Sequence, residues 1–206
     1  MAADVMPPAG LLASISALGA SSGALLVRHA DRFPIHPGQS GAAVLLTEQG
    51  EARAKELSRR LGAPPAWALS SPLTRCVDTA RLMGVTPAPS STLGAPGPFV
   101  LDPDLGRDLF HGHDTAFVVR SQICGETWGC MRPLAEGARL VHALLAERVA
   151  RHGGLGVAVS HDAIVMPYIA WATGHTFADD WLEPLDGIVV TPDHVIWQGR
   201  HYEVTL

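Results

Sequence analysis

Two apolar stretches of this chain each end on a histidine with charged neighbours. The run Gly-Ala-Leu-Leu-Val leads into residues 28–32, Arg-His-Ala-Asp-Arg, and the run Gly-Val-Ala-Val leads through Ser160 into His161 and Asp162. Each run has the length and the branched apolar residues of a buried parallel strand. The sequence therefore predicts that both histidines follow the carboxyl ends of parallel strands, where open α/β sheets bind their ligands.

A third segment has the same form. Residues 67–75 read Trp-Ala-Leu-Ser-Ser-Pro-Leu-Thr-Arg, so another strand end is followed by a predicted helix with an arginine in its first turn. We expect one pocket to gather the charged and imidazole side chains of the three junctions: Arg28, His29, Arg32, Arg75, His161 and Asp162. Such a pocket suits an anionic phosphoryl group, because each guanidinium can grip two oxygens at once.

The composition is that of an ordinary globular chain. With 206 residues, 47% of them hydrophobic and 17% charged, we expect one domain over residues 1–206. The net charge of -5 and the pI near 6.0 argue against a nucleic-acid surface, which needs clustered basic residues. No apolar run approaches the roughly 20 residues that cross a bilayer. We therefore expect neither nucleic acid nor membrane as a partner.

The N-terminal segment and the cysteines bear on the compartment. Residues 9–20 are apolar, but no basic residue precedes them, and their leucines and isoleucine fall at helical spacing. We interpret the segment as an amphipathic helix of a cytoplasmic protein. The three cysteines, Cys76, Cys124 and Cys130, lack zinc-finger spacing and favour a reducing compartment. We expect them to be small buried side chains, with a Cys124–Cys130 bridge as the alternative.

Strands and helices are predicted to alternate along the chain. Strands are expected near residues 24–28, 66–70, 155–159, 187–191 and 194–198, and helices near 47–61, 72–83, 133–151 and 163–172. Ser71 is the predicted N-cap of the second of these helices, with Pro72 at its first position. Residues 85–132 are rich in Pro and Gly and show no clear period, so a loop-rich insert over the site is expected there, with a short strand at 99–101. The alternation predicts a three-layer α/β/α sandwich with a mostly parallel central sheet.

The order of these motifs resembles a known family. Residues 28–34, Arg-His-Ala-Asp-Arg-Phe-Pro, are similar to the Arg-His-Gly-x-Arg-x-Pro signature of the histidine phosphatase superfamily, with Ala30 in place of glycine. The segments 46–50, 70–80 and 159–162 follow in the family's order, so the resemblance covers most of residues 24–175. It implies a phosphoglycerate mutase-like fold and a reaction without a cofactor.

The chemistry of the residues and the resemblance assign the same roles. A neutral imidazole at His29 is a competent nucleophile toward phosphorus, and a phosphohistidine intermediate divides hydrolysis into two easier steps. The phosphoryl oxygens need fixed positive charge, which Arg28, Arg32 and Arg75 supply, with His161 as a further donor. The resemblance implies these same four helpers around the phosphorylated histidine.

Asp162 is the predicted general acid and base. The His-Asp pair resembles the acid-phosphatase branch of the family, whereas the mutase-like branch takes a glutamate from the loop after the third strand. The equivalent loop here offers Asp102 or Asp104 and no glutamate. This disfavours a mutase and leaves these two aspartates as alternative proton donors.

We therefore expect a metal-independent phosphomonoesterase that acts on a small phosphorylated metabolite and releases inorganic phosphate. The alternatives are a phosphoryl-transferring mutase and a non-catalytic module that binds phosphate or a phosphoprotein. The apolar C-terminal strands raise the prospect of a homodimer.

The segment 104–132 carries further polar and aromatic residues. We expect substrate-lining roles for four of them: His111, His113, Arg120 and Trp128. The alternative reading of His111, His113 and Asp114 as zinc ligands is the weaker one, because a hydrolase site needs more ligands at defined positions. The tryptophans at 128, 171, 181 and 197 are expected to serve packing, with Trp128 as a wall of the pocket.

Overall fold

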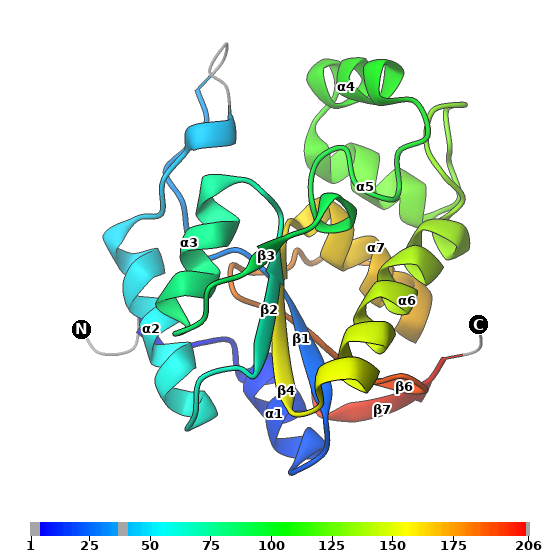
Figure 1. Ribbon diagram of the computed structural model, residues 1–206. Helices are drawn as coiled ribbons and strands as arrows, with labels where there is room; N and C mark the ends of the chain where they lie inside the picture. Colours follow the sequence, from blue (N-terminus) through cyan, green and yellow to red (C-terminus); the bar gives the residue numbers. More distant parts are fainter. Residues whose placement is uncertain (1–4, 37–40, 205–206) are drawn as a thin grey trace.

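The computed structural model describes residues 5–36 and 41–204, and a seven-stranded sheet forms its centre (Figure 1). The strand order is β3-β2-β4-β1-β5-β6-β7. The strands are β1 (Gly23–Arg28), β2 (Trp67–Ser70), β3 (Ala88–Pro89), β4 (Leu155–Ser160), β5 (Gly187–Val190), β6 (His194–Trp197) and β7 (Arg200–Glu203). The four strands β3, β2, β4 and β1 are parallel, and β5, β6 and β7 continue the sheet in antiparallel fashion.

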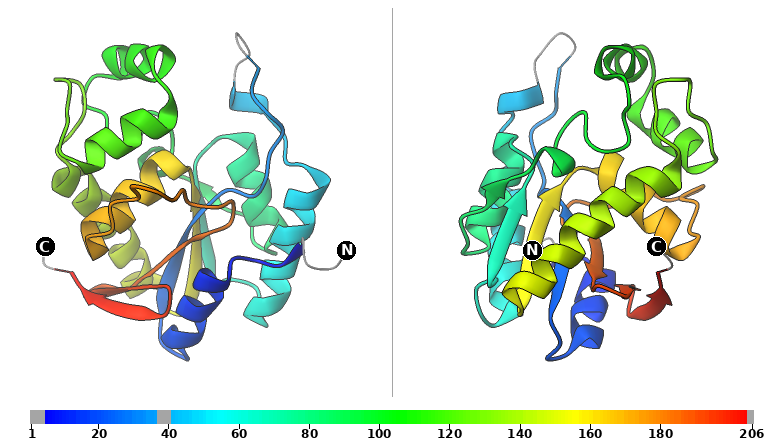
Figure 2. Two further views of the ribbon diagram at one scale, coloured as in Figure 1. Left: turned by 180° about the vertical axis from the view of Figure 1, so that it is seen from behind. Right: turned by 45° about the vertical axis from the view of Figure 1, so that its right-hand side comes forward.

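Helices cover both faces of this sheet (Figures 1 and 2). One face carries α1 (Ala9–Leu18), α2 (Glu48–Leu61) and α3 (Thr74–Leu82), and the other carries α6 (Leu134–His152) and α7 (Asp162–Thr173). The strand β1 is buried on both sides: Leu25 and Val27 join the core under α1 to α3, and Ala24 and Leu26 join the core under α6 and α7. This layering confirms the predicted α/β sandwich, whose centre is parallel.

Two helices stand above the carboxyl edge of the parallel strands (Figure 1). They are α4 (Pro103–Gly112) and α5 (Thr115–Ile123), and α5 packs against α7. Asp102 and Asp114 cap their N-termini by accepting backbone N–H groups, and Pro103 occupies the first turn of α4. The segment 85–132 was expected to be loop-rich, and this expectation is corrected here, because the two capped helices lie within it. The predicted strand at 99–101 is reduced to a single bridge between Val100 and Met131.

The strands β1, β2 and β4 end at the same level. Arg28 pairs with Ser160, and Ser70 pairs with Val159, so the residues that follow these strands emerge side by side. The chain then turns in opposite directions: α2 after β1 packs on one face of the sheet, and α7 after β4 packs on the other. A crevice opens at such a switch point between neighbouring strands.

The start of α3 differs from the prediction. The helix begins at Thr74 with Leu73 at its N-cap, whereas Ser71 accepts the backbone N–H of Leu73 in a turn before the helix. This extra turn keeps the Ser71 side chain at the end of β2. Arg75 nevertheless lies in the first turn of α3, as predicted.

The apolar C-terminal strands, which suggested a homodimer, do not form the edge of the sheet. The strands β5 and β6 lie inside the sheet, and the edge beyond them is β7, with the sequence Arg-His-Tyr-Glu. This strand has polar residues and was not predicted. The apolar strands that suggested a homodimer are therefore covered by another strand of the same chain.

All three cysteines are free, so the alternative Cys124–Cys130 bridge is absent. Cys76 and Cys130 are buried as expected, but Cys124 is exposed after the end of α5, which corrects the prediction for this residue. None of the helices in the described part of the chain is long and apolar enough to span a membrane.

Candidate active site

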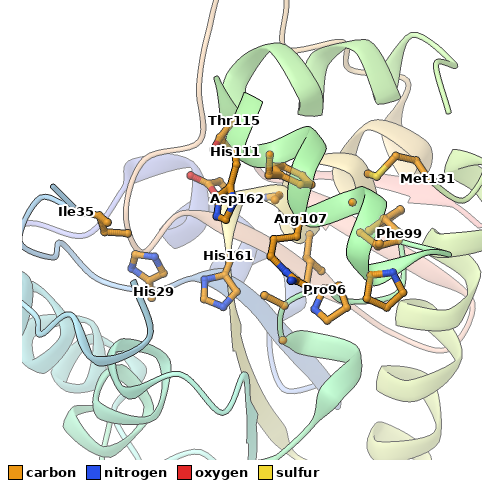
Figure 3. A pocket seen from close by; sticks show the side chains of 18 of the residues that line it. His29, Ile35, Pro96, Phe99, Arg107, His111, Thr115, Met131, His161 and Asp162 are labelled. Atoms are coloured by element: carbon orange, nitrogen blue, oxygen red, sulfur yellow. Dashed lines mark hydrogen bonds between the residues drawn. The ribbon is translucent and has the colours of Figure 1, made fainter. Parts of the chain in front are cut away.

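A cavity of about 470 Å³ opens at the carboxyl edge of β1, β2 and β4 (Figure 3). Five of the predicted site residues line it: His29, Arg32, Arg75, His161 and Asp162. They come from three junctions far apart in the sequence, and the parallel sheet brings them together. Arg28, the sixth predicted residue, does not line the cavity but reaches it through an ion pair with Asp162.

His29 is held in one tautomer by its own loop. Its ring Nδ1 lies 2.8 Å from the carbonyl oxygen of Ala30, so Nδ1 carries the proton and donates it. The lone pair is thereby left on Nε2. Burial lowers the pKa of His29 to about 4, and the positive charges of Arg75 and Arg28 act in the same direction. The imidazole is therefore neutral near pH 7, which is the form that a nucleophile requires.

The loop around His29 is fixed by the motifs that follow it. The Thr79 hydroxyl of α3 accepts the backbone N–H of Ala30 at 3.1 Å. Gly50 of α2 lies so close to the loop that a Cβ there would be 2.2 Å from the carbonyl oxygen of Asp31. The Thr47 hydroxyl caps α2 by accepting the backbone N–H of Gly50 at 3.0 Å. These contacts explain why the sequence segments 46–50 and 70–80 accompany the first histidine.

His161 faces His29 from the end of β4. The two ring centroids are 5.5 Å apart in an edge-to-face arrangement, and the two rings are neighbours in Figure 3. One ring nitrogen of His161 lies 3.2 Å from the Arg75 guanidinium, and the other lies 2.9 Å from the Ser71 hydroxyl. Burial, followed by the charge of Arg75, lowers the pKa of His161 to about 2. Ser71, interpreted from the sequence as a helix cap, is thus a partner of His161.

The arginines surround the two imidazoles with positive charge. Arg75 is buried at 8% exposure and is tied to the carbonyl oxygen of Gly41 at 2.7 Å. Arg28 donates to the carbonyl oxygen of Leu182. The buried Nε atoms of Arg28 and Arg75 have no hydrogen-bond partner within the described residues. Arg28 and Arg75 thus place two positive charges at the site, and Arg32 adds a third guanidinium at the wall of the cavity.

The carboxylate of Asp162 is oriented by three donors. Its Oδ2 accepts from the Arg28 guanidinium at 3.1 Å and from the Trp181 indole N–H at 3.3 Å. Its Oδ1 accepts the backbone N–H of Ala163 in the first turn of α7. Trp181 was expected to serve packing only, and its contact with Asp162 corrects that expectation. No pattern in the sequence indicates this contact, because Trp181 lies in the irregular segment between α7 and β5.

The two alternative proton donors lie outside the cavity. Asp102 accepts the backbone N–H groups of Asp104 and Leu105 as the cap of α4. The exposed Asp104 carboxylate forms an ion pair with Arg107 one turn along the same helix. Neither carboxylate lines the cavity, whereas Asp162 does. The geometry therefore favours Asp162.

Of the four residues expected to have substrate-lining roles, only His111 lines the cavity. The His113 ring packs against Phe117 at 5.2 Å between centroids, and Trp128 lies 6.4 Å from the same ring. Arg120 donates to the carbonyl oxygen of Phe177 at 2.9 Å. His113, Arg120 and Trp128 make these contacts and do not line the cavity, which corrects the prediction for these three.

The zinc alternative for His111, His113 and Asp114 is not supported by their geometry. Asp114 caps α5, His113 packs on Phe117, and His111 faces the cavity. Within residues 5–36 and 41–204, no group of three or more His, Cys, Asp or Glu side chains is arranged to hold a metal ion.

Comparisons with known proteins agree with the motifs and with the fold. Residues 24–91 match the family model of the histidine phosphatase superfamily, branch 1. Among curated proteins, none matches the sequence significantly. This match confirms the predicted resemblance to the superfamily over residues 24–91.

Solved structures share this fold at low sequence identity. A mycobacterial glucosyl-3-phosphoglycerate phosphatase is 18% identical with a TM-score of 0.55, over 82% of this chain and 89% of that one. The product of open reading frame Rv3214 from Mycobacterium tuberculosis is 19% identical with a TM-score of 0.54, over 90% of this chain and 96% of that one. YhfR from Bacillus stearothermophilus is 18% identical with a TM-score of 0.53, over 81% of this chain and 89% of that one.

Proposed function

We propose that this chain, whose residues 24–91 match the histidine phosphatase superfamily, hydrolyses phosphate monoesters through a phosphohistidine on His29. The observation that carries the proposal is the hydrogen bond from His29 Nδ1 to Ala30, which leaves the lone pair on Nε2 beside the arginines of the cavity. The phosphatase named among the structures of similar fold supports the same class of reaction.

In the first step, the Nε2 lone pair of His29 attacks the phosphorus atom and the bond from phosphorus to the leaving oxygen breaks. Asp162 donates a proton to that oxygen, and the alcohol departs. Arg28, Arg32 and Arg75 neutralise the charge on the phosphoryl oxygens, and His161 assists them. Because these groups supply the positive charge themselves, the proposal needs no metal ion.

In the second step, the Asp162 carboxylate takes a proton from a water molecule, whose oxygen attacks the phosphorus of the phosphohistidine. The phosphorus–nitrogen bond breaks, the electron pair returns to Nε2, and inorganic phosphate leaves. The second step thereby returns to Asp162 the proton that it gave to the leaving oxygen, and it leaves His29 neutral.

An assay with p-nitrophenyl phosphate, with and without a chelator, tests the proposal. We expect hydrolysis that resists the chelator in the wild type and is lost in His29→Ala. Phosphate binding without any hydrolysis would instead support a non-catalytic module. Loss of activity on chelation would contradict a metal-independent reaction.

A further inference from the structure

The cavity extends well beyond the phosphoryl site, and this extension is apolar. Starting at His29 and passing His161, it continues toward Pro96, Phe99 and Met131, which Figure 3 shows at the side away from His29. Val100, Phe110 and Ile164 complete this wall. The whole cavity, at about 470 Å³, lies within the range of roughly 300 to 1,000 Å³ that holds typical ligands, so it has room for a complete small-molecule ester.

Buried apolar side chains form one wall of the extension, and the polar side chains that line it from α4 and α5, namely Arg107, His111 and Thr115, are exposed. Phe99 and Met131 are 2% exposed and Ile164 is 3% exposed. The charge of Arg107 is also already paired with Asp104. The interior wall therefore offers few partners for the hydroxyl groups of a sugar.

The close approach of α4 shapes this wall. Gly106 is buried on the cavity side of the helix, and a Cβ there would lie 2.6 Å from a methyl group of Val100. The glycine lets α4 cover Val100 directly. The chain thus places a helix backbone over the apolar wall and narrows the extension.

From this distribution we infer that the physiological leaving group is an apolar alcohol of aromatic or comparable size; the inference rests on the proposed phosphatase activity. A buried hydroxyl group without a partner is unfavourable, whereas an apolar skeleton gains by leaving water. Selectivity for the carbon skeleton would therefore come from the wall of Phe99, Val100, Phe110, Met131 and Ile164, and the phosphate group would bind in the same way for all esters.

Three alkyl phosphates with leaving alcohols of similar acidity test this inference. 2-Phenylethyl phosphate carries an apolar skeleton, and glycerol 3-phosphate and glucose 6-phosphate carry hydroxyl groups. Since none of the three is an activated aryl ester, differences in kcat/KM report recognition of the skeleton. We expect kcat/KM for 2-phenylethyl phosphate to exceed both others by about tenfold or more.

A matched pair of variants connects the preference to the wall. Val100→Thr replaces a methyl group with a hydroxyl of similar size at the wall, and Val85→Thr makes the same change at a half-buried position outside the cavity. We expect Val100→Thr to lower the ratio of kcat/KM for 2-phenylethyl phosphate over glycerol 3-phosphate by about threefold or more. The control is expected to keep the wild-type ratio.

Each result has a distinct meaning. The inference is overturned if the wild-type kcat/KM for 2-phenylethyl phosphate is less than threefold that for the hydroxylated esters, or if the hydroxylated esters are preferred. Hydrolysis itself would still support the proposed phosphatase activity. Absence of hydrolysis of all three esters and of p-nitrophenyl phosphate overturns the proposed function together with the inference. Because the wild-type comparison needs no variant, poor folding of Val100→Thr would not prevent the test.

Discussion

The Arg28 guanidinium holds the Asp162 carboxylate at 3.1 Å, so the candidate phosphate ligand and the candidate acid are partners in the free protein. A bound phosphate ester would compete with Asp162 for Arg28, since both are anions. Binding of the ester would thereby weaken the ion pair between Arg28 and Asp162. The relationship gives a physical reason why ester binding would release the Asp162 carboxyl group from Arg28.

Asp162→Asn should remove the acid and base without removing the phosphate ligands. We expect kcat for p-nitrophenyl phosphate or an alkyl phosphate to fall by about 10²- to 10⁴-fold, more for the alkyl ester, because its leaving group needs the proton more. Inhibition by inorganic phosphate should persist. Asp104→Asn is the control and should keep the wild-type kcat. Full activity of Asp162→Asn would transfer the role of general acid and base to Asp102 or Asp104.

Trp181 should act as a positioning residue for Asp162. Trp181→Phe removes the indole N–H that lies 3.3 Å from Oδ2 and keeps an aromatic ring. We expect kcat for an alkyl phosphate to fall roughly three- to tenfold, which corresponds to the loss of one ordinary hydrogen bond of about 0.5–1.5 kcal/mol, with a shifted pH profile. Trp128→Phe makes the same chemical change outside the cavity and should leave kcat and the pH profile unaltered. Equal effects of Trp181→Phe and Trp128→Phe would contradict the positioning role.

The His29 imidazole should titrate far below an ordinary histidine. Its pKa is lowered from 6.5 to about 4, chiefly by burial, and NMR titration of the free protein can measure it. Because the folded protein binds this proton less tightly than the unfolded chain, the contribution of His29 to stability is present above about pH 6.5 and is lost as the pH falls toward 4. A titration midpoint near 6.5 would show that the ring is solvated rather than buried.

Gly50 should be intolerant of a side chain. In Gly50→Ala the new methyl group would meet the backbone oxygen of Asp31 at 2.2 Å, so either α2 or the loop that carries His29 must move. We expect a loss of about 1–3 kcal/mol in the free energy of unfolding, measured by urea denaturation, together with reduced activity. Gly112→Ala, at a helical glycine with nothing within 4 Å, is the control and should be neutral or stabilising.

The sequence indicates the strands and the site residues that follow them, because apolar runs and turn residues are local signals. The gathering of His29, Arg32, Arg75, His161 and Asp162 follows from parallel strands whose carboxyl ends share one edge. The two helices α4 and α5 were missed, although Asp102 and Asp114 cap them, since the Pro- and Gly-rich stretch before them favoured an interpretation as loop.

Contacts between distant segments were beyond the reach of sequence patterns. The hydrogen bond of Trp181 to Asp162 joins the loop after α7 to the start of that helix, and the bond of Ser71 to His161 joins two strand ends. Both depend on how the chain returns to the site in three dimensions. For the same reason, the sequence indicated four lining side chains within residues 111–128, and of these four the structure places only His111 at the cavity.

The most direct test of the account is capture of phosphate on His29 during turnover. The protein would be mixed with a ³²P-labelled monoester and denatured within milliseconds at alkaline pH, where a phosphorus–nitrogen bond survives, and the labelled residue would be identified by mass spectrometry. The account predicts label on His29 in the wild type, increased label in Asp162→Asn with an activated aryl ester, and none in His29→Ala. Rapid hydrolysis by the wild type with no label on His29 at any time point would contradict it.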